Sequence, residues 1–208
     1  MGRQKEERFR STLLEWAEEN LRDFPWREQD RSLYEVFVAE FFLTQTPASN
    51  VESVYPEFLD QYPTLDAIEE TTKRELVDVI EPLGFYNMRA EALQCIAAEN
   101  EHLPQTATEL GELPRVVDYV ANATLCFASN EPLPVVDRNV ERIYRRVFRD
   151  WPDSSTEQYR FAARLVPEDE ARVYNLALLD FAAAVCKPDP SCECCFAADY
   201  CEYYREQT

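Results

Sequence analysis

Five of the seven cysteines in this 208-residue chain lie within sixteen residues, in the segment CKPDPSCECCFAADYC. Five residues separate Cys186 from Cys192, two separate Cys192 from Cys195, and five separate Cys195 from Cys201, with Cys194 as the fifth cysteine. Thiolates this close on a proline-broken loop can converge on one centre, either a zinc ion or a four-iron cluster. Zinc sites more often join two C-x-x-C pairs, whereas this loop has a single pair with wide arms. The spacing therefore favours an iron–sulfur cluster, with zinc or a role without metal as alternatives.

The cellular compartment decides how these thiols behave. The N-terminus, MGRQKEERFR, is charged and no apolar segment follows it, so we expect no secretory signal and a cytoplasmic protein. Thiols stay reduced there, which argues against disulfides. The chain has no run of about 18 apolar residues, so no membrane span is expected. The other two cysteines, Cys95 and Cys126, lie in apolar helical segments and are predicted to be buried core thiols.

The charge balance is strongly acidic. The chain has 40 acidic and 21 basic residues, a formal net charge of −19, and only three lysines. Acid excess together with lysine depletion predicts a halophilic protein, because salt screens the self-repulsion of a dense carboxylate surface. An ordinary acidic, soluble protein is the alternative. This charge argues against nucleic-acid binding in dilute buffer.

The elements that must position the cysteines are predicted to be helices. Only three glycines occur, fewer than strand-rich folds need at their turns, and prolines recur between apolar segments with helical spacing. Hydrophobic residues make up 46% of the chain, so a packed core is expected. The pattern predicts about ten short helices and no sheet. Five stretches fit the S/T-x-x-E capping box, starting at Ser32, Ser49, Thr72, Thr106 and Ser154.

Several motifs in order resemble one family. The segment YNLALLDFAAAVC runs into the cysteines, and FPWR (24–27), LYEVFVAEFFLTQT (33–46), GFYNMRAEAL (84–93), LPRVVDYVANATLCFA (113–128) and PVVDRNVERIYRRVF (134–148) precede it. This set resembles the iron–sulfur DNA glycosylases of the endonuclease III, or helix-hairpin-helix, superfamily. It is most similar to the adenine and thymine mismatch glycosylases. The resemblance extends from about residue 10 to residue 204.

The resemblance implies an all-α, two-lobed helix-hairpin-helix glycosylase fold with a C-terminal iron–sulfur cluster loop. It implies a central helical domain with the hairpin at 24–130, and a terminal domain formed by 1–23 and 131–208. Cys186, Cys192, Cys195 and Cys201 would hold a [4Fe-4S] cluster, although the first gap is five residues where the family usually has six. That difference leaves open whether Cys194 replaces a neighbour. The partner would be double-stranded DNA containing a mismatch, bound by a monomer.

Three residues match catalytic positions of the family. Asp137 matches the aspartate that stabilises positive charge on the sugar, although an aspartate here could equally cap a helix. Tyr119 stands where bifunctional members have the lysine that forms a Schiff base, and a tyrosine cannot form an imine. A core tyrosine is its alternative. Glu40 matches the glutamate that protonates adenine in adenine glycosylases, and a solvent-facing helix residue is its alternative.

Three more residues match positions that contact DNA. Gln45 would fill the gap left by a flipped base, and Phe85 would be the apolar wedge, unless it is a core residue. The family hairpin reads L-P-G-x-G, but this chain has Arg115 and Val117 in place of the glycines. Val117 should resist a positive φ, so the hairpin is expected to be reshaped. Arg115 could compensate by contacting a phosphate directly.

The combined prediction is a monofunctional glycosylase of base excision repair that removes thymine or uracil opposite guanine. The chain ends soon after the cysteines, where adenine glycosylases usually continue into a further domain, so thymine or uracil is favoured over adenine. An adenine glycosylase acting on A/G mismatches is one alternative. A degenerate, non-catalytic DNA-binding iron–sulfur paralogue is the other.

Overall fold

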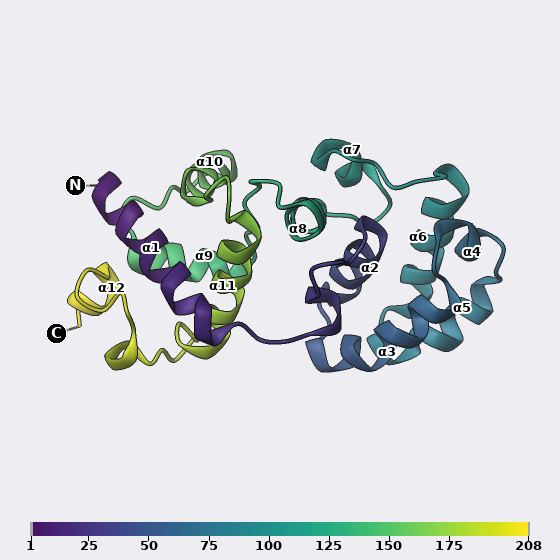
Figure 1. The fold of residues 1–208 in the computed structure, drawn as a ribbon, viewed down its shortest axis with the longest axis horizontal. Helices are drawn as coiled ribbons and strands as arrows, with labels where there is room; N and C mark the ends of the chain where they lie inside the picture. Colours follow the sequence, from purple (N-terminus) through teal and green to yellow (C-terminus); the bar gives the residue numbers. More distant parts are fainter. Residues whose placement is uncertain (1, 208) are drawn as a thin grey trace. The chain divides into compact units, whose positions relative to one another are not determined.

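The computed structural model describes residues 2–207, and every regular element in that range is a helix (Figure 1). The predicted all-α fold class is confirmed for these residues. The chain divides into two compact units. The terminal unit combines Met1–Arg22 with Asn130–Thr208, and the central unit is Asp23–Ser129.

In the central unit α2 packs against α8, and α4 and α5 pack against α6. It also contains two short 3-10 helices: η1 precedes α2, and η2 lies between α5 and α6. Its elements are η1 (Pro25–Arg27), α2 (Leu33–Leu43), α3 (Ala48–Gln61), α4 (Leu65–Glu69), α5 (Lys73–Ile80), η2 (Glu81–Leu83), α6 (Tyr86–Glu99), α7 (Ala107–Glu112) and α8 (Asp118–Ser129).

The terminal unit packs its first helix on helices from the other end of the chain: α11 lies against both α1 and α9. Its elements are α1 (Gly2–Asn20), α9 (Arg138–Val147), α10 (Ser155–Leu165), α11 (Ala171–Ala184), η3 (Cys192–Cys194) and α12 (Glu202–Arg205). The predicted cysteine loop therefore follows α11 and ends at the short helix α12 (Figure 1).

Four of the five predicted helix starts are confirmed. Ser32 and Thr72 form complete capping boxes, and Thr106 and Ser154 each accept a hydrogen bond from the third backbone N–H of their helix. The predicted helix start at Ser49 is wrong, because α3 begins at Ala48 and its N-cap is Pro47. Proline fixes φ without donating a hydrogen bond, and with Pro47 as its N-cap the helix starts two residues earlier than a Ser49 cap would start it.

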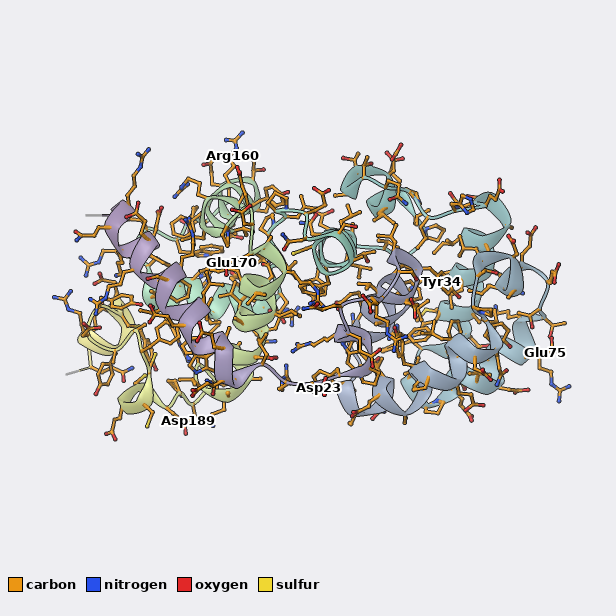
Figure 2. All side chains as sticks on the ribbon, in the orientation of Figure 1. Asp23, Tyr34, Glu75, Arg160, Glu170 and Asp189 are labelled. Carbon is orange, nitrogen blue, oxygen red and sulfur yellow. The ribbon has the colours of Figure 1, made fainter. Side chains whose placement is uncertain are left out.

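Helix α2 is the core of the central unit. Every residue from Val36 to Phe42 is buried, so this helix has no polar face in contact with solvent along that stretch. Phe42 packs edge-on against Phe58 of α3 with ring centroids 4.9 Å apart. Tyr34, at the start of α2 (Figure 2), donates from its hydroxyl to the carbonyl of Tyr62 at 2.6 Å. A glutamate in the middle of this buried helix needs a specific explanation.

Aromatic rings fill the core of the terminal unit. Tyr144 lies 5.2 Å from Trp151 in a stacked arrangement, and Phe9 meets Phe148 edge-on at 5.4 Å. The buried Asp180 on α11 accepts hydrogen bonds from the backbone N–H and the Nε of Arg22, at 2.8 and 2.7 Å. A buried carboxylate requires such partners. The contact fixes the last residue of the first terminal-unit segment onto α11.

Candidate functional site

Glu40 is a buried carboxyl at the centre of α2. It is 3% exposed, and its Oε2 has no hydrogen-bond partner within residues 2–207. Burial raises the pKa of Glu40 to about 7, although the positive charge of Arg27 and a side-chain hydrogen bond with Tyr119 both lower that pKa. Burial dominates because it penalises the charged form of an acid. Glu40 is therefore poised to hold or release a proton near neutral pH.

The elements around Glu40 explain why its partners are Arg27 and Tyr119. Helix α8 packs on α2 and carries Tyr119 in its first turn, while η1, which also contacts α2, ends at Arg27. The alternative that Glu40 is a solvent-facing helix residue is contradicted by its burial. Tyr119 is half-buried rather than a fully enclosed core tyrosine. Within the central unit the Glu40 carboxyl thus has a tyrosine hydroxyl as its hydrogen-bond partner and a guanidinium near enough to act on it by charge, a combination capable of acid–base chemistry.

Asp137 begins helix α9 in the terminal unit. Its Oδ1 accepts hydrogen bonds from the backbone N–H groups of Asn139 and Val140 at 2.9 and 2.8 Å, so it is an N-cap. Its Oδ2 accepts from the Nδ2 of Asn139 at 2.7 Å. The capping interpretation is confirmed, and it leaves the carboxylate half-buried rather than enclosed. Three donors hold the carboxylate in one orientation, which is what electrostatic stabilisation of a nearby cation requires.

The three predicted DNA contacts share an uncommon backbone conformation. Gln45, Phe85 and Arg115 have φ values of 56°, 50° and 64°. All three are exposed, Phe85 by 53%, so the alternative that Phe85 is a core residue is contradicted. A side-chain-bearing residue in the left-handed region is strained by about 1 kcal/mol, and such strain is concentrated at functional sites.

The hairpin without glycines keeps the turn that glycine would favour. The backbone N–H of Val116 donates to the carbonyl of Leu113 at 3.1 Å, with Pro114 and Arg115 between them. Proline followed by a residue of positive φ is the arrangement of a type II turn. Arg115 therefore takes the strained conformation at the first glycine position, whereas Val117 does not have a positive φ. Arg115 thus adopts the backbone that the family glycine would favour, and Val117 lacks a positive φ, as predicted for a β-branched residue.

Replacing Arg115 by glycine is expected to stabilise the chain by about 1 kcal/mol, because glycine adopts a positive φ without steric cost. The free energy of unfolding by urea measures the change. Gly111, half-buried on α7, offers the matched control, since Gly111→Ala adds a methyl group where no φ strain exists. A loss of stability in Arg115→Gly would mean that the arginine side chain contributes more than its backbone costs.

Four cysteines line one small cavity of the terminal unit. Cys186, Cys192, Cys195 and Cys201 share it with Arg146 of α9 and with Phe181, Val185 and Tyr203. Cys194 is exposed and is not among the lining residues. Burial raises the pKa of Cys195 to about 11 and also raises the pKa values of Cys192 and Cys201. Wholly or partly buried thiols held together in this way become thiolates only if a positive centre accompanies them.

Backbone and side-chain N–H groups point at these sulfurs. The N–H of Ala197 donates to the Sγ of Cys195 at 3.4 Å, and the Nη1 of Arg146 lies 3.5 Å from the Sγ of Cys186. Backbone N–H groups of Tyr203 and Tyr204 lower the pKa of Cys201 against the effect of burial. Hydrogen bonds to sulfur are a usual feature of thiolate-bound centres.

Two arginines of α9 hold the cysteine loop in place, a role that the sequence did not reveal. Arg146 donates to the carbonyls of Lys187 and Pro188 at 2.6 and 2.9 Å, and Arg142 donates to the carbonyl of Cys186 at 2.9 Å. An irregular loop leaves its carbonyls without helix partners, so side-chain donors must supply them. Arg142 and Arg146 thus anchor the cysteine loop to α9 by hydrogen bonds to its carbonyl groups.

The side chains lining this cavity do not form a closed ligand cage. Within residues 2–207, no group of three or more His, Cys, Asp or Glu side chains is arranged to hold a metal ion. The fit therefore rests on the donor set, four thiols around one cavity with N–H donors directed at them, which suits a centre that prefers sulfur. Of the two isolated cysteines, Cys126 is buried as predicted, but Cys95 is exposed, so its assignment to the core is wrong.

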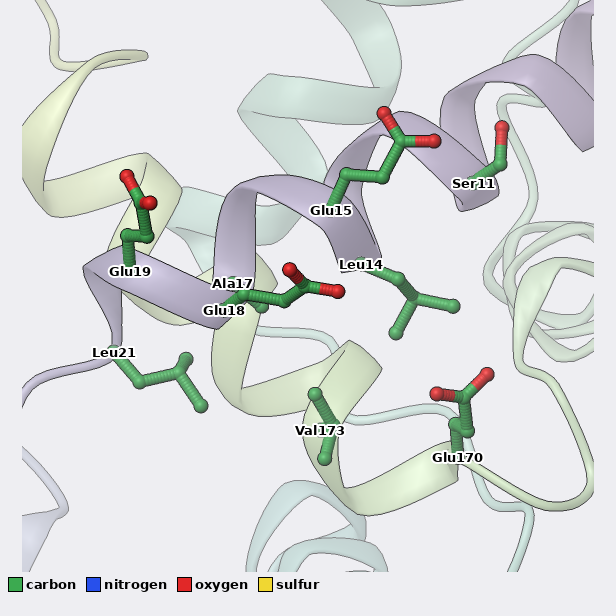
Figure 3. A pocket seen from close by; sticks show the side chains of 9 residues that line it. All are labelled: Ser11, Leu14, Glu15, Ala17, Glu18, Glu19, Leu21, Glu170 and Val173. Atoms are coloured by element: carbon green, nitrogen blue, oxygen red, sulfur yellow. The ribbon is translucent and has the colours of Figure 1, made fainter.

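A groove along α1 is unsuited to DNA (Figure 3). Its lining combines the apolar side chains of Leu14, Ala17, Leu21 and Val173 with four glutamates: Glu15, Glu18, Glu19 and Glu170. No basic side chain lines it. Because phosphate binding depends on lysine and arginine, this surface would repel a duplex.

Comparison with known proteins places the chain in a family. The model of the HhH-GPD superfamily base excision DNA repair protein matches residues 38–168. A thymine/uracil-DNA glycosylase of Pyrobaculum aerophilum is 33% identical over 215 residues, or 96% of this chain and 93% of that protein. An adenine DNA glycosylase of Mycolicibacterium smegmatis is 35% identical over 88% of this chain and 65% of that protein. A solved structure of a thermostable thymine-DNA glycosylase has a TM-score of 0.93 and 31% identity over 99% of both chains.

The chain therefore belongs to the HhH-GPD superfamily of base excision DNA repair proteins. The family resemblance predicted from the motifs and the glycosylase fold are both confirmed. No helix within the described residues is long and apolar enough to span a membrane.

Proposed function

We propose that this chain is a monofunctional DNA glycosylase that hydrolyses the N-glycosidic bond of thymine or uracil opposite guanine in duplex DNA. The observation that carries the proposal is the buried Glu40, with a pKa of about 7 and a hydrogen bond to Tyr119. The thymine/uracil-DNA glycosylase of Pyrobaculum aerophilum, similar over 96% of the chain, supports the choice of base. We expect the protein to act as a monomer.

Each proposed residue has a separate task. As the bond from the sugar to the base breaks, its electron pair leaves with the base, and protonated Glu40 supplies the proton that neutralises the leaving group. The sugar becomes positively charged, and the Asp137 carboxylate stabilises that charge. Water then adds to the sugar carbon and loses a proton to Asp137. The products are a free base and an abasic site.

Tyr119 accounts for the absence of strand cleavage in this proposal. A bifunctional enzyme needs an amine at this point of α8 to form a Schiff base, and a phenol cannot form one. Lys5 and Lys73 are engaged with Glu202 and Glu91 at 2.9 and 3.1 Å. The helix that carries Tyr119 has no lysine.

We further propose that Cys186, Cys192, Cys195 and Cys201 bind a [4Fe-4S] cluster. Four sulfurs around one cavity, with N–H donors to three of them, suit such a cluster. When bound, the cluster would order the loop structurally, and zinc is the alternative occupant. The exposed Cys194 is proposed not to be a ligand.

Labelled duplexes carrying T·G, U·G, or adenine opposite guanine or oxidised guanine would test the proposed reaction. The buffer would contain molar-range KCl, because a net charge of −19 opposes DNA binding at low salt. Mild alkali converts abasic sites into strand breaks. Breaks only after alkali, in the T·G and U·G duplexes, are the expected result. Excision of adenine alone would establish the adenine alternative, and no excision by iron-loaded protein would support a non-catalytic paralogue.

Glu40→Gln is expected to remove a pH dependence of stability. With its pKa raised to about 7, folded Glu40 keeps a proton that the unfolded chain releases above its ordinary value of 4.5. Its stabilising contribution is therefore complete below about pH 4.5 and is lost as pH rises through 7. As pH rises from 4.5 to 8, the free energy of unfolding of the variant should therefore increase by roughly 3 kcal/mol relative to that of wild type.

Unfolding by urea at several pH values measures this difference. Glu52→Gln, on the exposed side of α3, is the control and should differ from wild type by a constant amount. A constant difference for Glu40→Gln as well would show that the Glu40 pKa is not raised.

A further inference from the structure

Arg89 on α6 is a buried arginine whose five side-chain hydrogen bonds join it to the end of α2 and to two turns. It is 4% exposed. Its Nε donates to the carbonyl of Gly84 at 3.1 Å, and its Nη1 donates to the carbonyl of Phe41 at 2.6 Å. Its Nη2 donates to the carbonyl of Thr44 at 2.7 Å and the Oγ1 of Thr46 at 2.8 Å, and Nη1 also reaches the Oγ1 of Thr44 at 3.3 Å. These acceptors are neutral, so the buried charge is held by geometry rather than by a carboxylate.

The two turns that Arg89 joins carry the strained residues. Gln45 lies between Thr44 and Thr46, and Phe85 follows Gly84. The Oγ1 of Thr46 also donates to the carbonyl of Leu83 at 3.0 Å, which links the two turns directly. A left-handed conformation persists only where the surroundings determine it, and the planar guanidinium with five fixed donors provides such surroundings.

The third strained residue lies in the same region. The positive charge of Arg115 lowers the pKa of Arg89, in addition to the larger effect of burial. Of the exposed residues of positive φ in the central unit, Gln45 and Phe85 thus lie on the turns that Arg89 joins, and Arg115 is near enough for its charge to act on Arg89.

We propose that Arg89 is a positioning residue that fixes the spacing of Gln45 and Phe85, so that wedge and gap-filler enter the duplex together. The inference rests on the proposed function. Opening a base pair costs unstacking energy that is recovered only if the gap is filled at once. Two side chains on independently mobile turns would each lose conformational freedom on binding, and prior alignment avoids that loss.

The test measures base opening, which does not require excision. Full-length Asp137→Asn protein would be mixed with a T·G duplex that carries 2-aminopurine beside the thymine. The fluorescence of 2-aminopurine rises when the base stack around it opens. In this background, Gln45→Ala and Phe85→Ala should each reduce opening, and the double variant should show a coupling of about tenfold. Adding Arg89→Lys, which keeps the charge but loses the planar donors, should reduce opening about tenfold and abolish that coupling.

The coupling separates positioning from general support, because loss of stability alone would lower opening without changing how the two substitutions combine. Arg160→Lys on α10, an exposed arginine paired with Glu157, is the matched control (Figure 2). If Arg89→Lys fails to fold, Thr46→Val removes one shared hydroxyl and should lower the coupling in the same direction. If Arg89→Lys changes neither the opening nor the coupling, the positioning role of Arg89 is overturned while the proposed function stands. No opening by the parent protein would overturn it together with the proposed function.

Discussion

Asp137→Asn is expected to lower the rate of base excision by about 10³-fold while changing the free energy of unfolding by less than about 1 kcal/mol. The reason is that Asp137 has two separable tasks. As an N-cap, its Oδ1 accepts from two backbone N–H groups, and an asparagine side-chain oxygen can accept the same two bonds. As a charged group, it stabilises the cationic sugar of the proposed reaction, and a neutral amide cannot do so.

Single-turnover excision on the preferred duplex, alongside urea unfolding, measures the two tasks separately. Ser154→Ala on α10 is the inverse control, because it removes an N-cap that accepts from Glu157 at 3.3 Å. It should cost about 1 kcal/mol of stability and leave excision unchanged. An Asp137→Asn protein that excises at the wild-type rate would reduce Asp137 to a helix cap.

Glu40, the candidate acid, shows which properties of a site residue can be predicted from the sequence and which cannot. A glutamate inside VFVAEFFL was predicted as a site residue, but its burial could not be decided from one helix. The reason is that burial depends on which helices cover α2. Helix α8 reaches it from a distant part of the chain, and η1, which precedes α2, packs back on it. The raised pKa follows from that packing and not from the local sequence.

Errors in the prediction have the same origin. Cys95 lies in an apolar segment but on the exposed side of α6, since periodicity alone does not say which side is covered. Arg89 gave no signal in the sequence, because its acceptors belong to residues 41–46 and to residue 84, two segments that meet only after folding. Local signals performed better: four helix caps were predicted correctly, and each involves residues three apart.

In the hairpin, the packing around the turn outweighs the preference of a single residue for a negative φ. Leu113, Pro114 and Arg115 lack the glycine that the family motif has, yet Arg115 still adopts a φ of 64°. A proline at the second turn position and the Val116 hydrogen bond to Leu113 fix the turn, and the following helix α8 begins at Asp118. A cost of about 1 kcal/mol at one residue is small beside the packing of a whole helix.

Two neighbouring cysteines provide the sharpest test of the proposed cluster. Cys195→Ser is expected to abolish iron binding and to lower stability by several kcal/mol, whereas Cys194→Ser should change neither. Cys195 lines the cavity and accepts a hydrogen bond from the N–H of Ala197, while Cys194 is exposed. The two variants differ by one position, so they share any general effect of losing a thiol from this loop.

Iron, sulfide and zinc analysis of protein purified without oxygen, together with thermal unfolding, measures the outcome. Iron and sulfide in equal amounts, absent only from Cys195→Ser, are expected for a four-iron cluster, whereas zinc in their place would establish the alternative occupant. Equal loss in both variants would bring Cys194 into the ligand set, and no metal in wild type would overturn the proposal. The expected loss of stability follows from the packing of the terminal unit. Arg142 and Arg146 donate to the loop carbonyls, but the four thiols are wholly or partly buried, and thiolates this close together need a cation among them.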